Sequence, residues 1–221
     1  MSATAIVAAA RRALADPLNP RSLAGRARER RWQVLQQRFP TVSSMRVLDL
    51  GGWLSSWRSV SGRPAEVVSL NLNEQEDEPG SWGRSVVGDA CCPPDWLLEE
   101  PFDLVYSNSL IEHVGGHHRC LALAEVVHAA APHHWVQTPY RYFPVEPHWL
   151  CPGLQFLPVA ARAKVASSWP FGFMSSTEAT SLDDVLSVSL LSVTEMKHYF
   201  PQSEVIRDTW LGATKSIVAV L

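Results

Sequence analysis

The sequence has no long hydrophobic run, no C-x-x-C pair, no internal repeat and no low-complexity segment. A membrane-spanning helix needs about 20 consecutive apolar residues, so the chain is not expected to cross a membrane. The apolar start, Ala3 to Ala10, is followed rather than preceded by basic residues, which is the wrong order for a secretory signal. With 46% hydrophobic and 19% charged residues, the composition predicts a soluble globular protein, which we expect in the cytoplasm.

Cysteine is scarce and its spacing is uninformative for metal binding. The four cysteines are Cys91, Cys92, Cys120 and Cys151. Adjacent cysteines rarely form a bridge, and a cytosolic enzyme keeps its thiols reduced. We therefore expect small buried side chains rather than a redox or metal site.

Charge is spread unevenly along the chain. Residues 1–40 carry eight arginines against two acids, a charge of +6, and the whole chain carries −3, which leaves −9 for the rest. A basic segment can bind nucleic acid or an acidic surface. Trp32, Leu35 and Phe39 recur at helical spacing, which favours a packed helix with a solvated face. Nucleic acid is not the expected partner.

Hydrophobic runs and turn residues predict alternating strands and helices. Helices or helical turns are expected over 4–15, 22–38, 53–60, 95–99, 117–131 and 194–200. Strands are expected over 45–50, 66–71, 85–88, 102–107, 134–138, 203–208 and 214–221. The alternation predicts an α/β protein with a mostly parallel sheet.

Each of the first four predicted strands ends in hydrogen-bonding side chains. The first strand leads through Asp49 into the glycine pair 51–52, and the others end at Asn71, Asp89 and the polar run 107–109. Glycines let backbone approach a ligand closely. In an open parallel sheet, ligands bind just beyond the carboxyl ends of the strands. These four ends together predict a cleft for a nucleotide-like molecule.

The same segments, in this order, resemble the motifs of class I S-adenosylmethionine-dependent methyltransferases. The matching runs are VLDLGG, VVSLNLNE, VVGDA and FDLVYSNSLIEHV. The resemblance covers roughly Met45 to Leu221 and is closest to the small type 11 group; residues 135–148 resemble an actinobacterial subgroup, some of whose members methylate sugars. It implies one domain, 1–221, with a helical cap over 1–40. It also implies a Rossmann-like, seven-stranded, mostly parallel sheet with an antiparallel last strand and helices on both faces.

The glycine-rich segment departs from the family pattern. The usual signature is G-x-G-x-G, whereas residues 51–55 read Gly-Gly-Trp-Leu-Ser. The resemblance implies that Gly51 and Gly52 pass under the carboxypropyl part of S-adenosylmethionine, that Trp53 leaves less room there, and that Asp49 organises the turn. Asn71 stands where an acid usually binds the ribose, and it lacks that charge. The missing glycine and acid also disfavour an NAD-dependent oxidoreductase.

The resemblance assigns the remaining cofactor contacts to the third and fourth strands. Asp89 would accept a hydrogen bond from the adenine amine, and the amide of Ala90 would donate to a ring nitrogen. Ser107, Asn108 and Ser109 would lie beside the sulfonium and orient its methyl group. Taken alone, the segment around Asp89 is also typical of a turn with a helix N-cap.

Methyl transfer to an alcohol requires a base, because the hydroxyl must lose its proton as the new bond forms. His113 and His148 are the candidates, since imidazole suits this role near neutral pH. Glu146 could orient the imidazole of His148 or bind a sugar hydroxyl. Taken alone, each histidine is more often an ordinary hydrogen-bonded polar residue than a base.

Residues 139–193 do not fit the strand and helix alternation and are rich in aromatic residues. We interpret them as an insertion that covers the active site and shapes specificity. Arg141 could donate to hydroxyls, and Tyr142, Phe143 and Trp149 could provide platforms for a sugar. Exposed aromatic residues here would serve a homodimer as well as a substrate.

A metal site is not predicted. Glu112, His113, His117 and His118 lie close in sequence, but Gly115-Gly116 interrupts any fixed helical spacing. Mg²⁺ would assist an oxygen nucleophile, yet it prefers carboxylates, and too few are present. The other histidines of this region are assigned to the surface or to helix ends: His128, His133 and His134.

The resulting expectation is an S-adenosylmethionine-dependent O-methyltransferase that acts on a small polar acceptor, a sugar or glycoside. A mannoside of mycobacterial-type polysaccharide synthesis is one candidate. The alternatives are a methyltransferase of a lipid, quinone or other natural product, and a degenerate methyltransferase fold that serves as a binding module.

Overall fold

The structure is a computed structural model that describes residues 22–221 except 59, 79, 81 and 175. The predicted helix 4–15 lies outside the described residues. The chain divides into two compact units. The sheet unit comprises Thr41–Phe143 and Ser187–Leu221, and the helical unit comprises the described residues up to Pro40 together with Pro144–Leu186.

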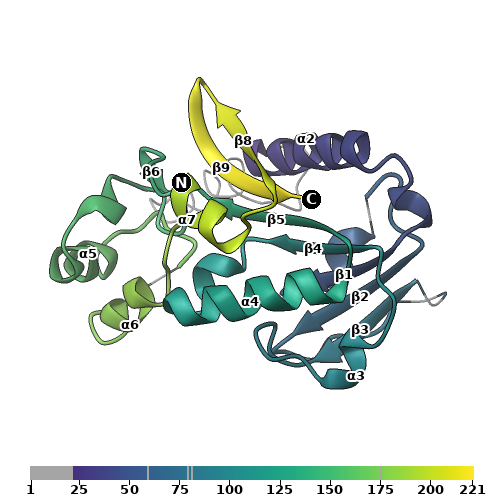
Figure 1. The fold of residues 1–221 in the computed structure, drawn as a ribbon. Helices are drawn as coiled ribbons and strands as arrows, with labels where there is room; N and C mark the ends of the chain where they lie inside the picture. The colour runs from purple at the N-terminus through teal and green to yellow at the C-terminus, as the bar shows by residue number, and fades with distance from the viewer. Residues whose placement is uncertain (1–21, 59, 79, 81, 175) are drawn as a thin grey trace, which may run out of the picture. The chain divides into compact units, whose positions relative to one another are not determined.

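The sheet unit contains a single seven-stranded sheet of order β3-β2-β1-β4-β5-β9-β8 (Figure 1). Neighbours from β3 to β5 pair in parallel, and β9 pairs antiparallel with both β5 and β8. The prediction of a mostly parallel sheet with an antiparallel last strand is confirmed. The strands are β1 Arg46–Leu50, β2 Glu66–Asn71, β3 Gly83–Val87, β4 Leu104–Asn108, β5 His133–Pro139, β8 Glu204–Trp210 and β9 Ala213–Val220.

The central strands form where the sequence has unbroken apolar runs. Val47, Leu48 and Leu50 of β1 are fully buried, as expected for a parallel strand covered on both faces. The edge strand β3 begins at Gly83, two residues before the predicted start, because its register with β2 extends from Val67↔Gly83 to Asn71↔Val87. Pairing with β2 therefore extends the strand into residues 83 and 84, which the sequence pattern assigns to a loop.

Helices α3, α4 and α7 lie within one residue of their predicted bounds, inside the usual uncertainty of helix ends. Helix α7 begins with a capping box in which Ser192 and Glu195 bond each other's backbone N–H groups. The predicted helix 53–60 is a single 3₁₀ turn. The elements are η1 Val42–Ser44, η2 Leu54–Trp57, α3 Asp95–Leu98, η3 Ile111–His113, α4 Gly116–Ala130 and α7 Val193–Tyr199.

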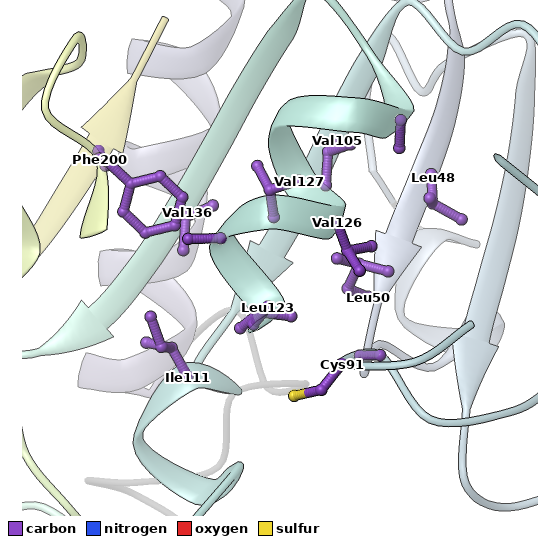
Figure 2. Close-up of a cluster of buried hydrophobic side chains, with 14 of the residues drawn as sticks. Leu48, Leu50, Cys91, Val105, Ile111, Leu123, Val126, Val127, Val136 and Phe200 are labelled. Carbon is purple, nitrogen blue, oxygen red and sulfur yellow. The ribbon is translucent and has the colours of Figure 1, made fainter. Parts of the chain in front are cut away.

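Helix α4 packs one apolar face on the sheet (Figure 2). Leu123 and Val127 of this helix are fully buried and belong to the same cluster as Leu50, Val105 and Val136 from three neighbouring strands. Burial of this kind contributes roughly 2 kcal/mol for each large side chain. The packing fixes the sheet whose carboxyl edge carries the polar residues singled out above.

The strand order creates a switch point at β1. The chain runs outward from β1 to β2 and β3, then returns to place β4 on the other side of β1. At such a reversal the connections leave in opposite directions and open a crevice beyond the strand ends, where ligands bind in open α/β sheets. The glycine pair 51–52 lies at this point, directly after β1.

The helical unit contains one long helix and an irregular segment. Ser22 Oγ accepts a hydrogen bond from Gly25 N at 2.8 Å and so caps α2, in which Trp32 and Leu35 are buried as their spacing predicted. The predicted insertion has secondary structure of its own within 144–186. The elements of this unit are α2 Leu23–Arg38, β6 Val145–Glu146, β7 Cys151–Pro152, η4 Leu154–Phe156, α5 Val159–Ala166 and α6 Ser181–Leu186.

None of the helices in the described part of the chain is both long enough and apolar enough to span a bilayer.

The assignment of His134 to the surface or to a helix end is wrong, because this residue lies in β5. Its side chain is fully buried, its Nε2 lies 2.7 Å from Ser203 Oγ, and its ring packs 5.3 Å from Phe200. Burial, together with the charges of His128 and His133, lowers the pKa of His134 to about 4. The residues that bury it, Phe200 and Ser203, are distant in sequence, so the residues next to His134 in the chain do not indicate its burial.

This burial predicts a pH-dependent stability. Because the folded pKa lies below that of an unfolded histidine, the stabilisation is complete above about pH 6.5 and is lost as the pH falls toward about 4. Between about pH 7.5 and about pH 5.5 we expect His134 to account for a loss of about 1.4 kcal/mol. Urea unfolding at both pH values should show that His134→Gln removes this loss. The control His118→Gln, at an exposed position of α4, should show the same loss as the wild type. If His134→Gln also loses as much free energy of unfolding as the wild type between the two pH values, His134 is not the cause.

Candidate functional site

The turn after β1 is built so that only glycine fits. Gly51 has a φ of +76°, and its N–H donates to Leu70 O at 2.8 Å. A Cβ at Gly51 would lie 2.7 Å from Leu110 Cδ1, and a Cβ at Gly52 would lie 1.8 Å from Asp49 Oδ2. The space that the glycines leave is thus partly filled by the protein's own side chains.

Asp49 lies beneath this turn and connects it to η2. Its side chain is 1% exposed, and Oδ2 accepts a hydrogen bond from Trp57 Nε1 at 2.7 Å. The indole of Trp57 packs edge-on against Tyr106 of β4, with ring centroids 5.0 Å apart. The carboxylate therefore ties the turn to an aromatic pair under the sheet edge.

Side chains from the end of β2 hold the turn from the other side. The carbonyl oxygen of Gly52 accepts hydrogen bonds from Ser69 Oγ at 2.8 Å, Gln75 Nε2 at 3.0 Å and Asn71 Nδ2 at 3.1 Å. Asn71, expected at the ribose, is thus engaged with the turn. Ser69 and Gln75 were not predicted, although a serine within the apolar run of β2 was a usable signal.

Exposed apolar side chains surround the same edge of the sheet. Leu72, the residue after β2, is 73% exposed, Val87 at the end of β3 is 54% exposed, and Trp53 in the turn is 50% exposed. Because Asn71 and Val87 are register partners, these residues follow neighbouring strand ends. Apolar groups of this kind are suited to cover a flat ligand ring. The sequence prediction included Trp53 and missed Leu72 and Val87.

Asp89 is held in its ionised form. Arg119 NH2 lies 2.8 and 2.7 Å from its two carboxylate oxygens, and Cys91 N donates to Oδ1 at 2.9 Å. Burial raises the pKa of Asp89, but the Cys91 amide and Arg119 outweigh it, so the net pKa lies below the usual value. The carboxylate can accept further hydrogen bonds from a ligand N–H. Ala90, next to it, is buried, and Arg119 was not predicted.

The end of β4 contains a strained serine. Ser107 is buried and its Oγ donates to Leu50 O at 3.3 Å, whereas Asn108 is exposed. Ser109 has a φ of +57°, and its N–H and Oγ bond the main-chain and side-chain oxygens of Gln137 at 2.9 and 3.2 Å. A non-glycine residue in this region costs roughly 1 kcal/mol or more, and such positions cluster at functional sites.

Glu112 is fully buried after β4. Its Oε2 accepts a hydrogen bond from Thr138 Oγ1 at 2.9 Å, and its main-chain oxygen accepts one from Ser189 N at 2.8 Å. His113, the first candidate base, is exposed in η3. His117 bonds elsewhere, with its Nδ1 3.1 Å from the hydroxyl of Tyr199.

The second candidate base, His148, lies in the helical unit and is held by Glu146. Its Nδ1 lies 2.7 Å from Glu146 Oε1, and Oε2 accepts the N–H groups of His148 and Trp149, both at 2.8 Å. The side chain of Glu146 is 4% exposed and that of His148 is 14% exposed. A carboxylate in this position fixes the orientation of an imidazole and directs Nε2 the other way.

The four predicted substrate residues differ in exposure. Tyr142 is 57% exposed and its ring lies 5.5 Å from Tyr140, but Phe143 and Trp149 are buried. Arg141 donates to Leu190 O at 2.7 Å and to Glu195 Oε1 at 2.8 Å. Tyr142 therefore offers an open aromatic face, while the guanidinium of Arg141 holds the segment that leads into α7.

The cysteines behave as buried thiols with one exception. Burial raises the pKa of Cys91 to about 11, which disfavours the reactive thiolate. Cys120 and Cys151 are also buried, but Cys92 is exposed, contrary to the expectation for all four. Residues 89–92 form a tight turn in which Cys92 N bonds Asp89 O, and the turn directs adjacent side chains apart.

Gly52 in the turn and Gly116 at the start of α4 are expected to tolerate alanine differently. Gly52→Ala should cost about 3 kcal/mol, because its Cβ would overlap the carboxylate of Asp49. Gly116→Ala should cost about 1 kcal/mol, because that position has a φ of +77° but no neighbour within 4 Å. Urea unfolding of both variants tests the difference; equal losses would show that the turn relaxes around Asp49.

No family model matches this sequence, and no curated protein matches it. Solved structures do. The methyltransferase domain of bacterial CtHen1-CN has a TM-score of 0.54 at 10% identity, over 88% of this chain and 98% of that one. An S-adenosylmethionine-dependent methyltransferase from Mesorhizobium loti has a TM-score of 0.53 at 17% sequence identity, over 86% of this chain and 95% of that one. Magnesium protoporphyrin IX methyltransferase from Synechocystis, with bound SAH, has a TM-score of 0.52 at 9% sequence identity, over 88% of this chain and 83% of that one. The chain therefore has the Rossmann-like fold found in S-adenosylmethionine-dependent methyltransferases.

Proposed function

We propose that this protein is an S-adenosylmethionine-dependent O-methyltransferase and that its acceptor is a hydroxyl of a sugar or glycoside. The observation that carries the proposal is the glycine turn at the switch point of the sheet. Gly51 and Gly52 follow β1, between the ends of β2 and β4, where open α/β sheets bind their ligands. The fold shared with methyltransferases directs the choice among nucleotide-like ligands.

The residues around the turn suit S-adenosylmethionine. The ionised carboxylate of Asp89 would accept a hydrogen bond from the adenine amine, and the exposed side chain of Leu72 would cover the flat adenine ring. The glycine turn lets backbone meet the amino-acid part of the cofactor. When bound, the cofactor supplies an electrophilic methyl group. The chain's own task is then to orient the acceptor and take its proton.

A histidine is the proposed base. The pairing of His148 with Glu146 is the arrangement that prepares an imidazole to accept a proton from an alcohol. His113 is the second candidate. The exposed ring of Tyr142, beside Tyr140, would serve as a platform for the C–H face of a sugar. A mannoside belongs among the first acceptors to test.

A second candidate acceptor is a lipid, a quinone or another apolar natural product. The helical unit favours it, because Phe156, Phe171 and Phe173 are 55%, 42% and 44% exposed. Exposed aromatic side chains gathered in one segment are typical of binding surfaces. The third candidate is a binding module without enzymatic activity. A cofactor-binding measurement distinguishes it from the two methyltransferase candidates, because only those two need S-adenosylmethionine.

Titration calorimetry of the purified chain with S-adenosylmethionine and S-adenosylhomocysteine tests the cofactor site. We expect micromolar binding that Asp89→Asn weakens about tenfold, because a charged acceptor is replaced by a neutral amide. Asp183→Asn, at an exposed position of α6, is the matched control and should bind as the wild type does. No binding by the folded wild-type chain would overturn the enzyme proposal.

Transfer of a labelled methyl group then identifies the acceptor class. Saccharides, including mannosides, are compared with lipids and quinones under identical conditions. Label in a saccharide supports the sugar proposal, and label only in an apolar acceptor replaces it with the second candidate.

Substitution separates the two candidate bases. With the acceptor so found, His148→Gln should lower kcat roughly 100-fold and leave cofactor binding unchanged, because a general base acts in the chemical step. His113→Gln is the parallel variant. Glu146→Gln should reduce kcat less, because it weakens the contact that orients the imidazole but leaves the imidazole itself in place. A full loss in His113→Gln with none in His148→Gln would assign the role to His113.

A further inference from the structure

Three side-chain donors converge on one main-chain oxygen in the sheet unit. The Gly52 carbonyl accepts bonds from Ser69 Oγ, Asn71 Nδ2 and Gln75 Nε2 at 2.8, 3.1 and 3.0 Å. A carbonyl oxygen has two lone pairs, so this acceptor is fully used. Asn71 Nδ2 also donates to Gly51 O at 3.2 Å. Both carbonyls of the glycine pair are thereby held toward the end of β2.

The direction of both side-chain amides is fixed by their surroundings. Asn71 Oδ1 accepts from Asn73 N at 3.1 Å, and Gln75 Oε1 accepts from Leu54 N at 2.9 Å. Main-chain N–H groups can only donate, so the oxygens must face them and the NH₂ groups must face the glycine carbonyls. The second hydrogen of Gln75 reaches Ser69 Oγ at 3.2 Å. The cluster is internally consistent as a set of donors.

Holding these carbonyls also orients the neighbouring N–H groups. A peptide unit is planar and trans, so its N–H points opposite to its C=O. When the oxygens of Gly51 and Gly52 point toward β2, the N–H groups of Gly52 and Trp53 turn away from it. Two successive N–H groups presented in this way bind a carboxylate. The amino-acid part of S-adenosylmethionine carries such a group.

We propose that Ser69, Asn71 and Gln75 are positioning residues that hold the glycine turn in its cofactor-binding form. Asn71 then serves the turn through its amide hydrogens rather than replacing a ribose-binding acid. This inference rests on the proposed function, because it names the residues that shape that cofactor site. It explains why an amide stands at position 71: a carboxylate there could not donate to the glycine carbonyls.

The substitution Asn71→Asp separates the two roles of this position. If Asn71 were a weak substitute for a ribose-binding acid, aspartate would restore the charge and tighten cofactor binding. If Asn71 holds the turn, aspartate removes two donated hydrogen bonds and places a negative charge against carbonyl oxygens. The second case predicts weaker binding, by about tenfold or more. Gln75→Glu makes the same change at the second amide and should act in the same direction.

The experiment is calorimetric titration of S-adenosylmethionine into the full chain and into these two variants. Asn73→Asp is the matched control, because it adds the same charge two residues away, where the side chain is exposed and the main-chain N–H donates to Asn71 Oδ1. We expect this control to bind within about twofold of the wild type. Thermal unfolding confirms that all variants are folded. Binding by Asn71→Asp that equals or exceeds that of the wild type would overturn the inference.

A second measurement keeps the test independent of the proposed function. Hydrogen exchange of residues 51–57 without ligand should be faster in Asn71→Asp and Gln75→Glu than in the wild type and Asn73→Asp, because the turn loses its support. If the wild type binds no cofactor, the proposed function fails while the exchange still decides the inference. Equal exchange in all four chains would refute it.

Discussion

The turn after β1 is the constraint on which the rest of the site depends. It is closed from below by the carboxylate of Asp49, which occupies the space where a Cβ of Gly52 would stand. It is held from the side by the donors Ser69, Asn71 and Gln75, which lie in β2 or shortly after it. Asp49 belongs to β1 and Ser69 and Asn71 to its neighbour β2, so the pairing of these two strands brings most of the supporting side chains to the turn. The turn at the switch point is therefore held from two sides.

This arrangement means that the polar residues at the strand ends already have contacts within the protein. Asn71 is engaged with the glycine carbonyls, and Asp89 is paired with Arg119 and the Cys91 amide. Such contacts fix the side chains before a ligand arrives, which lowers the entropy lost on binding. They also keep Asp89 charged. Under the proposed function, the ligand would meet these preset acceptors and exposed apolar groups such as Leu72.

Local patterns sufficed for most elements. Apolar runs in β1 and β2 gave strands at nearly the right residues, the helix predicted over 194–200 is displaced by one residue from α7, and the spacing of Trp32 and Leu35 gave the buried face of α2. These signals work because strand and helix geometry repeat over a few residues. The start of β3 was missed, since pairing with β2 decides it. The strand-end positions followed in turn, because parallel strands bring their carboxyl ends to one edge.

The sequence by itself thus determined the succession of strands along the chain, the turn at the glycine pair and the set of polar residues at the edge of the sheet. Only the tertiary structure decided what those residues contact. His134 is buried under Phe200 and beside Ser203, Arg119 reaches back to Asp89, and Gln75 reaches Gly52. The physical reason is that these contacts join residues brought together by folding. Their geometry depends on packing over the whole sheet unit, which no periodicity within one segment encodes.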